Sequence, residues 1–317
     1  MKKSFNTAGL PVDKADKSKK EKGGPRTAFI AISGRPNVGK SSIMNRLLGQ
    51  KVAIVSSKPQ TTRTKIMGVL TSGEDQYVFI DTPGIHRPHD VLGEKMVKAA
   101  ADAVDSVDVC MLVCDASYPP AETEKNIVSG LKKSKTPVIL LLNKIDLVAD
   151  KQALLGTICA YSALYDFAGI IPVSAKTGDG FDAIFSELSP FLKPSVHFFD
   201  DDTLTDQPER VIAAEIIREK LLRRLSDEVP HGIAVAIDRF FDREDGLLDI
   251  EATVYCERDG HKGIIIGKGG SVLKEISTKA RVDLERFFDC KVNLRCWVKV
   301  KENWRNREGL IHNFGLD

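Results

Sequence analysis

The sequence predicts an α/β domain with a doubly wound, mostly parallel sheet, followed by a smaller α+β domain. In residues 27–192, short apolar runs alternate with segments of helical periodicity, which is typical of buried parallel strands covered by helices on both faces. Residues 193–208 interrupt this alternation with prolines and a run of aspartates, and we interpret them as a linker. Residues 209–317 then begin with a helical pattern and continue with strands. Residues 1–26 are rich in lysine, and their low hydrophobicity predicts a disordered basic tail.

The expected strands of the first domain are the apolar runs 28–32, 77–80, 107–114, 138–142 and 170–173. Helical patterns occupy 93–103, 121–131, 151–166 and 181–191. Residues 65–71 come shortly before the second strand, so a hairpin there would add one antiparallel strand. In the second domain we expect a helix at 209–226, strands at 233–240, 247–257 and 291–300, and a glycine turn with a helix at 267–280.

The composition is that of a soluble globular protein. Of the 317 residues, 42% are hydrophobic and 28% are charged, which leaves room for two domains with full cores. No apolar run approaches the ~20 residues of a membrane-spanning helix, and no apolar segment follows the first lysines as in a secretion signal. The six cysteines lack C-x-x-C spacing, so we expect reduced thiols in the cytoplasm. A net charge of +2 does not by itself indicate a nucleic-acid partner.

A glycine-framed loop between the run 28–32 and a helical pattern carries the strongest chemical signal. It reads Gly34-Arg35-Pro36-Asn37-Val38-Gly39-Lys40-Ser41, the G-x-x-x-x-G-K-S string that binds a nucleoside triphosphate in this setting. Its backbone N–H groups and the following helix end face the phosphates. Lys40 adds charge at the β- and γ-phosphates, and the Ser41 hydroxyl ligates Mg²⁺. The expected phosphate contacts are Gly34, Asn37, Val38, Gly39, Lys40, Ser41, Ser42 and Gly84.

Two downstream segments complete the phosphate and metal site. The run 77–80 ends in Asp81-Thr82-Pro83-Gly84, where Asp81 suits the acidic residue that orients Mg²⁺ or its water. The N–H of Gly84 can approach the γ-phosphate because glycine permits close backbone contact. The polar string Gln60-Thr61-Thr62-Arg63 is placed as a switch loop that orders on the γ-phosphate. Either Thr61 or Thr62 would complete the Mg²⁺ shell, and the sequence does not choose between them.

The base is expected to be guanine. Asn143-Lys144-Ile145-Asp146 follows the run 138–142, and the Asp146 carboxylate suits the adjacent N1–H and N2–H₂ donors of guanine. Adenine lacks this donor pair and would leave the carboxylate unpaired. Asn143 would hold the base and the loop, and the Lys144 stem would lie over the ring. After the next strand comes Ser174-Ala175-Lys176, in which the Ala175 N–H can reach guanine O6.

The residue after Gly84 is Ile85, where Ras-like and Gα GTPases place a water-orienting glutamine. An isoleucine cannot hydrogen-bond water, so we predict slow intrinsic hydrolysis of GTP to GDP and phosphate. Another residue, an ion or a partner would then position the water. His86 and His89 are interpreted as loop histidines and not as a metal pair.

The second domain contains a candidate nucleic-acid loop. Gly267-Lys268-Gly269-Gly270 fits G-x-x-G, the loop with which KH domains clamp a nucleic-acid backbone. The string 260–263 also fits, but only the later one lies between the apolar 264–266 and an apolar helix face at 272–276. Lys268 and Lys274 would supply positive charge, and Ile266 would line a groove for unstacked bases. An ordinary turn between helices is the alternative.

Together these motifs resemble the Era family of bacterial GTPases. The resemblance runs from about Arg26 to the last expected strand, and it also rests on the strings 214–220 and 294–300. It implies a P-loop GTPase domain, a type II KH domain and a role in small ribosomal subunit assembly. The partners it implies are GTP, GDP, the small subunit and the 3′ end of its ribosomal RNA, together with peripheral membrane association. It further implies that Ile85 is a normal feature of the active site, and we expect a monomer.

A rival hypothesis is a membrane-associated or protein-signalling GTPase whose C-terminal domain binds protein. Lipid anchoring finds no support, because residue 2 is Lys2 and the chain ends Gly315-Leu316-Asp317. An ATP-dependent kinase or motor is disfavoured by the guanine-type string at 143–146.

Overall fold

A computed structural model describes residues 24–58, 60–85, 88, 90–226 and 229–316, and these form two compact units. Of the described residues, the first unit contains those from 24 to 52, 65–82 and 100–206. The second contains residues 53–64, 83–99 and the chain from Gln207 onward. The basic tail predicted for residues 1–26 lies almost entirely outside the described residues, as do His86 and His89.

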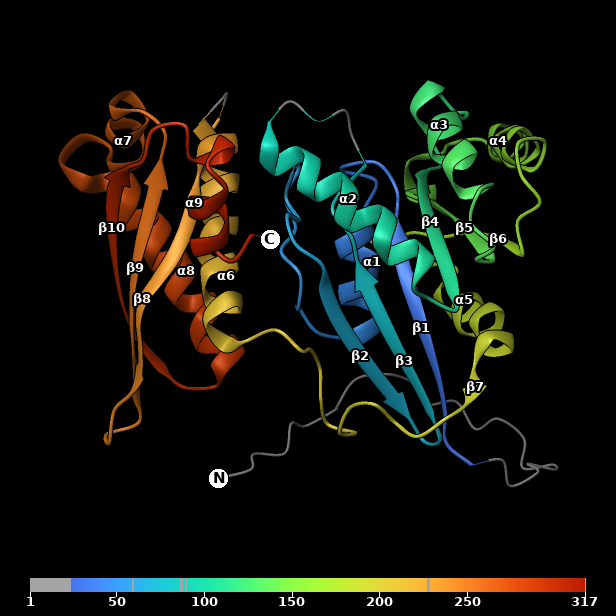
Figure 1. The fold of residues 1–317 in the computed structure, drawn as a ribbon, viewed down its shortest axis with the longest axis horizontal. Coiled ribbons are helices and arrows are strands. Elements are labelled where there is room, and N and C mark those ends of the chain that lie inside the picture. Colours follow the sequence, from blue (N-terminus) through green and yellow to red (C-terminus); the bar gives the residue numbers. More distant parts are fainter. Residues whose placement is uncertain (1–23, 59, 86–87, 89, 227–228, 317) are drawn as a thin grey trace. The chain divides into compact units, whose positions relative to one another are not determined.

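The first unit is built on a mostly parallel sheet with strand order β2-β3-β1-β4-β5-β6 and with β7 paired to β1 (Figure 1). All pairs are parallel except β2–β3 and β1–β7. The strands are β1 (Arg26–Ser33), β2 (Ile66–Ser72), β3 (Asp75–Asp81), β4 (Val109–Asp115), β5 (Val138–Asn143), β6 (Gly169–Pro172) and β7 (Lys193–Pro194). Every residue of β5 is buried, as expected for a central parallel strand covered on both faces. The predicted fold class of this domain is confirmed.

The helices of the first unit follow its strands in the expected alternation. They are α1 (Lys40–Leu48), the end of α2 (Val91–Asp105), α3 (Glu122–Leu131), α4 (Lys151–Ser162) and α5 (Phe181–Leu188), with single turns η1 (Ile145–Leu147) and η2 (Ser189–Phe191). Two predicted helices are too long. Helix α4 ends at Ser162 because the chain must enter β6, and the Ala168 N–H already donates to the Val138 carbonyl. Helix α5 gives way to a tight turn at Pro190, whose ring cannot continue an α-helix.

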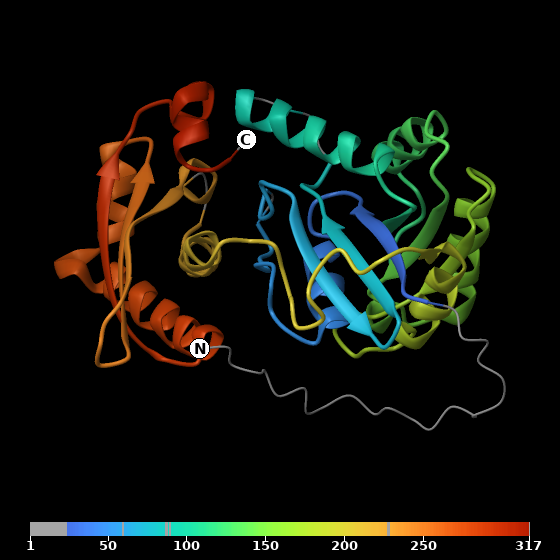
Figure 2. The same ribbon diagram turned by 60° about the horizontal axis from the view of Figure 1, so that its bottom comes forward.

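The segment predicted as a linker is bound to the first unit over most of its length. Residues 193–194 form β7, and the Val69 N–H donates to the Leu204 carbonyl. Gln76 is fully buried and exchanges hydrogen bonds with the backbone of Phe198 and Phe199. In Figure 2 this segment, in yellow, runs beside β2 and β3. It therefore covers the edge of the sheet before the chain enters the second unit.

The second unit has a three-stranded sheet of order β10-β9-β8, with β8–β9 antiparallel and β9–β10 parallel. Its strands are β8 (Ala234–Asp242), β9 (Leu247–Cys256) and β10 (Lys291–Val300). Its helices are α6 (Glu209–Arg224), α7 (Asp259–Ile266), α8 (Ser271–Phe288), α9 (Glu308–Asn313) and the start of α2, with single turns η3 (Val229–Gly232), η4 (Lys268–Gly270) and η5 (Trp304–Asn306). Alternate residues of β9, from Leu248 to Cys256, are buried in one core with residues of α6 and α8. The α+β prediction is confirmed, and the short helix α9 was not predicted.

None of the helices in the described part of the chain combines the length and apolar character of a membrane span.

Candidate functional site

The predicted nucleotide residues of the first unit lie at the carboxyl ends of its parallel strands. The glycine-framed loop follows β1, Asp81 ends β3, Asn143 ends β5 and Ser174 comes directly after β6 and Val173. Ligands of open α/β sheets bind outside this edge, because the carboxyl ends of neighbouring parallel strands meet there. The sheet therefore gathers residues that are up to 140 positions apart in the sequence, from Gly34 to Ser174.

The glycines of the loop are required by close backbone contacts. Gly34 and Gly39 have φ values of 142° and 102°, in the region that disfavours a side chain. A Cβ on Gly34 would lie 2.3 Å from the Val113 carbonyl oxygen. A Cβ on Gly39 would lie 2.3 Å from Nδ2 of Asn143. The loop is thus pressed against β4 and β5, and α1 starts directly after it at Lys40.

Lys40 is held inside the loop. Its side chain is buried, and Nζ donates to the carbonyl oxygens of Gly34 at 3.1 Å and Arg35 at 2.9 Å. Burial lowers the pKa of Lys40 to about 8, although the nearby charge of Asp81 acts in the opposite direction. This ammonium is a compact point charge at the place where phosphate oxygens would bind.

The two predicted metal residues of this unit are in direct contact. The Ser41 hydroxyl donates to Oδ2 of Asp81 at 2.6 Å, and Asp81 is fully buried. Hard oxygen ligands of this kind are the ones that Mg²⁺ prefers. Thr82 fixes the strand end, because its hydroxyl donates to the Ile32 carbonyl at 2.9 Å. Gly84 is buried and Ile85 is half-buried.

Asn143 joins the phosphate loop to the base loop. Its Nδ2 donates to the Val38 carbonyl at 2.8 Å, and its Oδ1 accepts from the Ala175 N–H at 2.9 Å. Asn143 is buried, so both hydrogen bonds are protected from water. The Ala175 N–H, which we expect to bind guanine O6, therefore donates to Asn143 in this structure. Asn143 thus links the phosphate loop to the base loop.

The predicted base carboxylate is held by its neighbours. The Ser174 hydroxyl donates to Oδ1 of Asp146 at 2.7 Å, and Lys176 lies 3.8 Å from Oδ2. Lys144 has a φ of 70°, in the left-handed region, and its ammonium pairs with Asp115 at 2.7 Å. Burial by itself would raise the pKa of Asp115, but hydrogen bonds from Lys144 and Ser117 lower it below its ordinary value.

Two supporting contacts were missed in the sequence. Asp115 ends β4 in register with Asn143 on β5, so its position at a strand end was the available signal. Arg35 of the phosphate loop pairs with Glu124 of α3 at 2.8 Å, and the Glu124 side chain is 8% exposed. This ion pair braces the loop against the first turn of α3, but neither residue carried a motif of its own.

Of the predicted switch residues, 60–63 and 83–85 cluster with the second unit, whereas Asp81 and Thr82 cluster with the first. The Arg63 guanidinium is buried, donates to the carbonyl oxygens of Ile233 at 2.5 Å and His231 at 3.0 Å, and lies 5.5 Å from the centroid of a Trp304 ring. The carbonyl of Thr61 accepts from Arg218, and Thr62 is buried. The choice of Thr61 or Thr62 as a metal ligand stays a prediction.

The start of α2 also lies in the second unit. Leu92 and Met96 share a buried apolar cluster with Ala234, Trp304 and Ile311. The segment that precedes α2 begins with the strand-end string of Asp81. Residues 53–64 and 83–99 therefore both cluster with the C-terminal unit, and the second of these segments contributes to its core.

The glycine loop of the second unit joins α7 to α8. Gly267, Gly269 and Gly270 have φ values of 72°, 58° and 78°. A Cβ on Gly267 would lie 2.5 Å from Cγ2 of Val272, whereas one on Gly269 or Gly270 would meet nothing within 4 Å. The last two glycines therefore face open space.

The residues predicted to line a groove at this loop differ in their exposure to solvent, and the groove itself stays a prediction. Lys268 and Lys274 are exposed and Ile266 is half-buried, while the neighbouring Ile264 is 53% exposed. The competing string at 260–263 lies inside α7 and is therefore helical, so it does not form a loop. Of the two G-x-x-G strings, only 267–270 therefore lies between two helices, and its role in binding nucleic acid stays a prediction.

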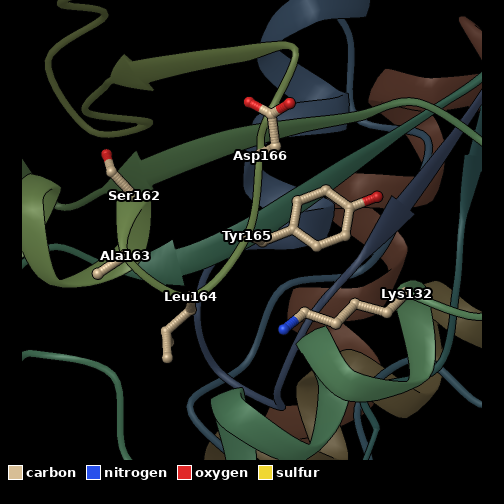
Figure 3. A pocket seen from close by; sticks show the side chains of 6 residues that line it. All are labelled: Lys132, Ser162, Ala163, Leu164, Tyr165 and Asp166. Atoms are coloured by element: carbon tan, nitrogen blue, oxygen red, sulfur yellow. The ribbon is translucent and has the colours of Figure 1, made fainter.

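A pocket of about 560 Å³ lies away from the nucleotide residues (Figure 3). It is lined by Lys132, Ser162, Ala163, Leu164, Tyr165 and Asp166, which come from the segments after α3 and around the end of α4. These segments precede β5 and β6, so they belong to the amino-terminal ends of the strands. In Figure 3 the Asp166 carboxylate points away from Lys132, so the charged groups do not converge.

Comparisons with known proteins agree with both units. The family model described as 50S ribosome-binding GTPase matches residues 29–144, and a KH domain model matches residues 228–305. GTPase Era of Ruminiclostridium cellulolyticum is 50% identical over 290 residues, which cover 92% of this chain and 97% of that protein. GTPase Era of Clostridioides difficile is 48% identical, with coverage of 92% and 99%.

Solved structures give the same result. A crystal structure of a variant of Aquifex aeolicus Era bound to GDP and AlF₄⁻ superposes with a TM-score of 0.89 at 37% identity, covering 92% of this chain and 99% of that one. A structure of Era with MgGDPNP and nucleotides 1506–1542 of 16S ribosomal RNA also gives a TM-score of 0.89, at 36% identity and the same coverage. The chain therefore belongs to the GTPase Era family.

Proposed function

We propose that this GTPase binds GTP and Mg²⁺ at the strand edge of the first unit and RNA at the glycine loop of the second. The biological target we infer is the 3′ end region of small-subunit ribosomal RNA, during assembly of the small ribosomal subunit. The observation that carries the nucleotide part is the convergence of Lys40, the Ser41–Asp81 pair and the Asn143–Asp146 string at one edge. The RNA part is supported by the open glycines at 269 and 270 and by the solved Era complex with 16S ribosomal RNA.

Each residue has a distinct task in this proposal. The loop N–H groups and Lys40 hold the phosphates, Ser41 and Asp81 hold the metal ion, and Asp146 reads the base. When bound, Mg²⁺ neutralises charge on the phosphate oxygens. Ile85 offers no hydrogen bond to the attacking water, so hydrolysis by the isolated protein is slow. A fast single-turnover rate without any partner would contradict this.

The two activities are coupled in this proposal through the switch segments. Residues 53–64 lie between Ser41 and Asp81 in the chain and residues 83–99 follow Asp81, and both segments cluster with the second unit. If Thr61 or Thr62 bound the metal, the segment that carries it would have to rearrange. This segment is hydrogen-bonded within the second unit, through the Thr61 carbonyl to Arg218 and through the Arg63 guanidinium to two backbone carbonyls. GTP would therefore change the second unit, and hydrolysis would reverse that change.

The substitution Gly269→Asp tests the RNA assignment. Gly269 faces open space, so the new carboxylate mainly adds a negative charge where a phosphate would lie. We expect loss of binding to a single-stranded RNA from the 3′ end of 16S ribosomal RNA, with unchanged GDP binding. Unchanged RNA binding would instead support the rival hypothesis of a C-terminal domain that binds protein.

We further propose that the protein acts as a monomer in the cytoplasm, with peripheral contact to the cell membrane. The proposed membrane contact is supported by the lysine-rich composition of residues 1–26, which suits an anionic surface. Co-sedimentation with vesicles that contain anionic lipid, with and without these residues, tests the membrane contact.

A further inference from the structure

Helix α1 carries an arginine that lies outside every nucleotide-binding motif of the sequence. Arg46, in the last turn of α1, donates from Nη1 to the carbonyl oxygens of Ala175 at 3.2 Å and Lys176 at 3.3 Å. Its Nη2 donates to the carbonyl oxygen of Thr177 at 2.7 Å. The guanidinium carbon also lies 5.5 Å from the centroid of the Phe181 ring. One side chain thus binds three successive carbonyls of the loop after β6.

The same loop carries the groups that would read the base. On its other side, the Ala175 N–H donates a hydrogen bond to Asn143, and the Ser174 hydroxyl donates one to Asp146. The peptide N–H of Ala175 therefore faces a base residue, while the carbonyls of residues 175–177 face Arg46. Movement of the loop would change both sets of contacts together.

The backbone after the loop is shaped to admit the guanidinium. Gly178 has a φ of 99°, and a Cβ there would lie 2.0 Å from Nη2 of Arg46. The loop closes on itself as well, because the Thr177 N–H donates to the Ser174 hydroxyl at 3.1 Å. A side chain at position 178 would displace Arg46 and remove its contacts.

We propose that Arg46 is a positioning residue for guanine recognition. It fixes residues 174–177 on α1, so that the Ala175 N–H and the carboxylate held by Ser174 meet the base in one geometry. Because α1 begins at Lys40 and Ser41, Arg46 also ties the base loop to the helix that serves the phosphates. The inference rests on the proposed nucleotide site.

The test measures the affinity of the full chain for nucleoside diphosphates that differ only in the base. For Arg46→Ala we expect GDP affinity to fall about tenfold, because charge-assisted hydrogen bonds to the loop are lost. 2-Aminopurine riboside diphosphate lacks both O6 and the N1–H, so it cannot accept from the Ala175 N–H and offers Asp146 only its amino group. Arg46→Ala should therefore weaken its binding less than that of GDP. Inosine diphosphate keeps O6 and should lose affinity nearly as GDP does. Arg46→Lys, which keeps a cation, should recover part of the loss.

Arg26→Ala is the control, since Arg26 is a half-exposed arginine at the start of β1 whose partner is Asp75 and not the loop after β6. It should leave all affinities unchanged. Equal losses for GDP and the analogue without O6, or wild-type GDP affinity in Arg46→Ala, would overturn the positioning role. A wild-type protein that binds ADP as tightly as GDP would overturn the proposed site, and this inference with it.

Discussion

At the scale of single residues, Lys40 shows most clearly how burial prepares a charge for its task. Its free-protein pKa of about 8 results from burial, against the opposing influence of Asp81. Phosphate oxygens beside the ammonium favour its charged form and would raise that pKa. Nucleotide binding should therefore take up a proton near pH 8, and affinity should fall as the pH rises above 8 because the free protein loses the charge.

Calorimetry of GDP binding in buffers of different ionisation enthalpy measures this proton uptake. We expect about half a proton per site at pH 8 and much less at pH 6.5, where Lys40 is already charged. Absence of uptake at pH 8 would show that the ammonium does not meet the phosphates.

In the proposed site, the Asp146 carboxylate selects guanine over other bases. An Asp146→Asn amide can accept at only one atom and donates from the other, so it loses one of the two guanine donors. Xanthine carries a carbonyl where guanine carries its amino group, and the new amide can donate to it. We expect GTP affinity to fall by about 100-fold and XTP affinity to rise, which a competition assay against labelled GDP measures. If GTP still bound as in the wild type, Asp146 would not contact the base.

At the scale of elements, the turn between α7 and α8 separates a packing glycine from exposed ones. Gly267→Ala would strain a left-handed backbone and also press a methyl group on Val272. We expect it to lower the free energy of unfolding by about 3 kcal/mol. Gly269→Ala meets no neighbour and should cost about 1 kcal/mol, from backbone strain alone.

Urea denaturation followed by tryptophan fluorescence can measure this difference. The chain has two tryptophans, Trp297 and Trp304, and both lie in the second unit, so the signal reports on that unit. Equal costs for the two variants would show that the contact with Val272 does not limit the turn.

Elements with a strong local pattern were predictable from sequence. The parallel strands of the first unit are continuous apolar runs, and the strings that begin at Gly34, Asp81, Asn143 and Ser174 each lie at or just after the end of one of them. Helix α9 was missed because it spans only residues 308–313, too few for a helical period to stand out. Asp115 was missed because a single aspartate after a strand has no motif, and its role appears only when β4 lies in register with β5.

At the scale of the whole molecule, the division of the chain could not be read from local patterns. The sequence places residues 53–64 and 83–99 in the first domain, whereas they cluster with the second unit. The contacts responsible, such as Arg63 with Ile233, join residues 170 positions apart. A buried arginine in a polar loop gives no sign in the sequence of which carbonyls will accept from it.

In the proposed function, the bound nucleotide governs RNA binding by the C-terminal unit. The most direct measurement compares the affinity of the full chain for a single-stranded RNA from the 3′ end of 16S ribosomal RNA, once with a non-hydrolysable GTP analogue and Mg²⁺ and once with GDP and Mg²⁺. We predict different affinities in the two states, because only the γ-phosphate recruits the switch segment that contributes to the second unit. Equal affinities would contradict the claim.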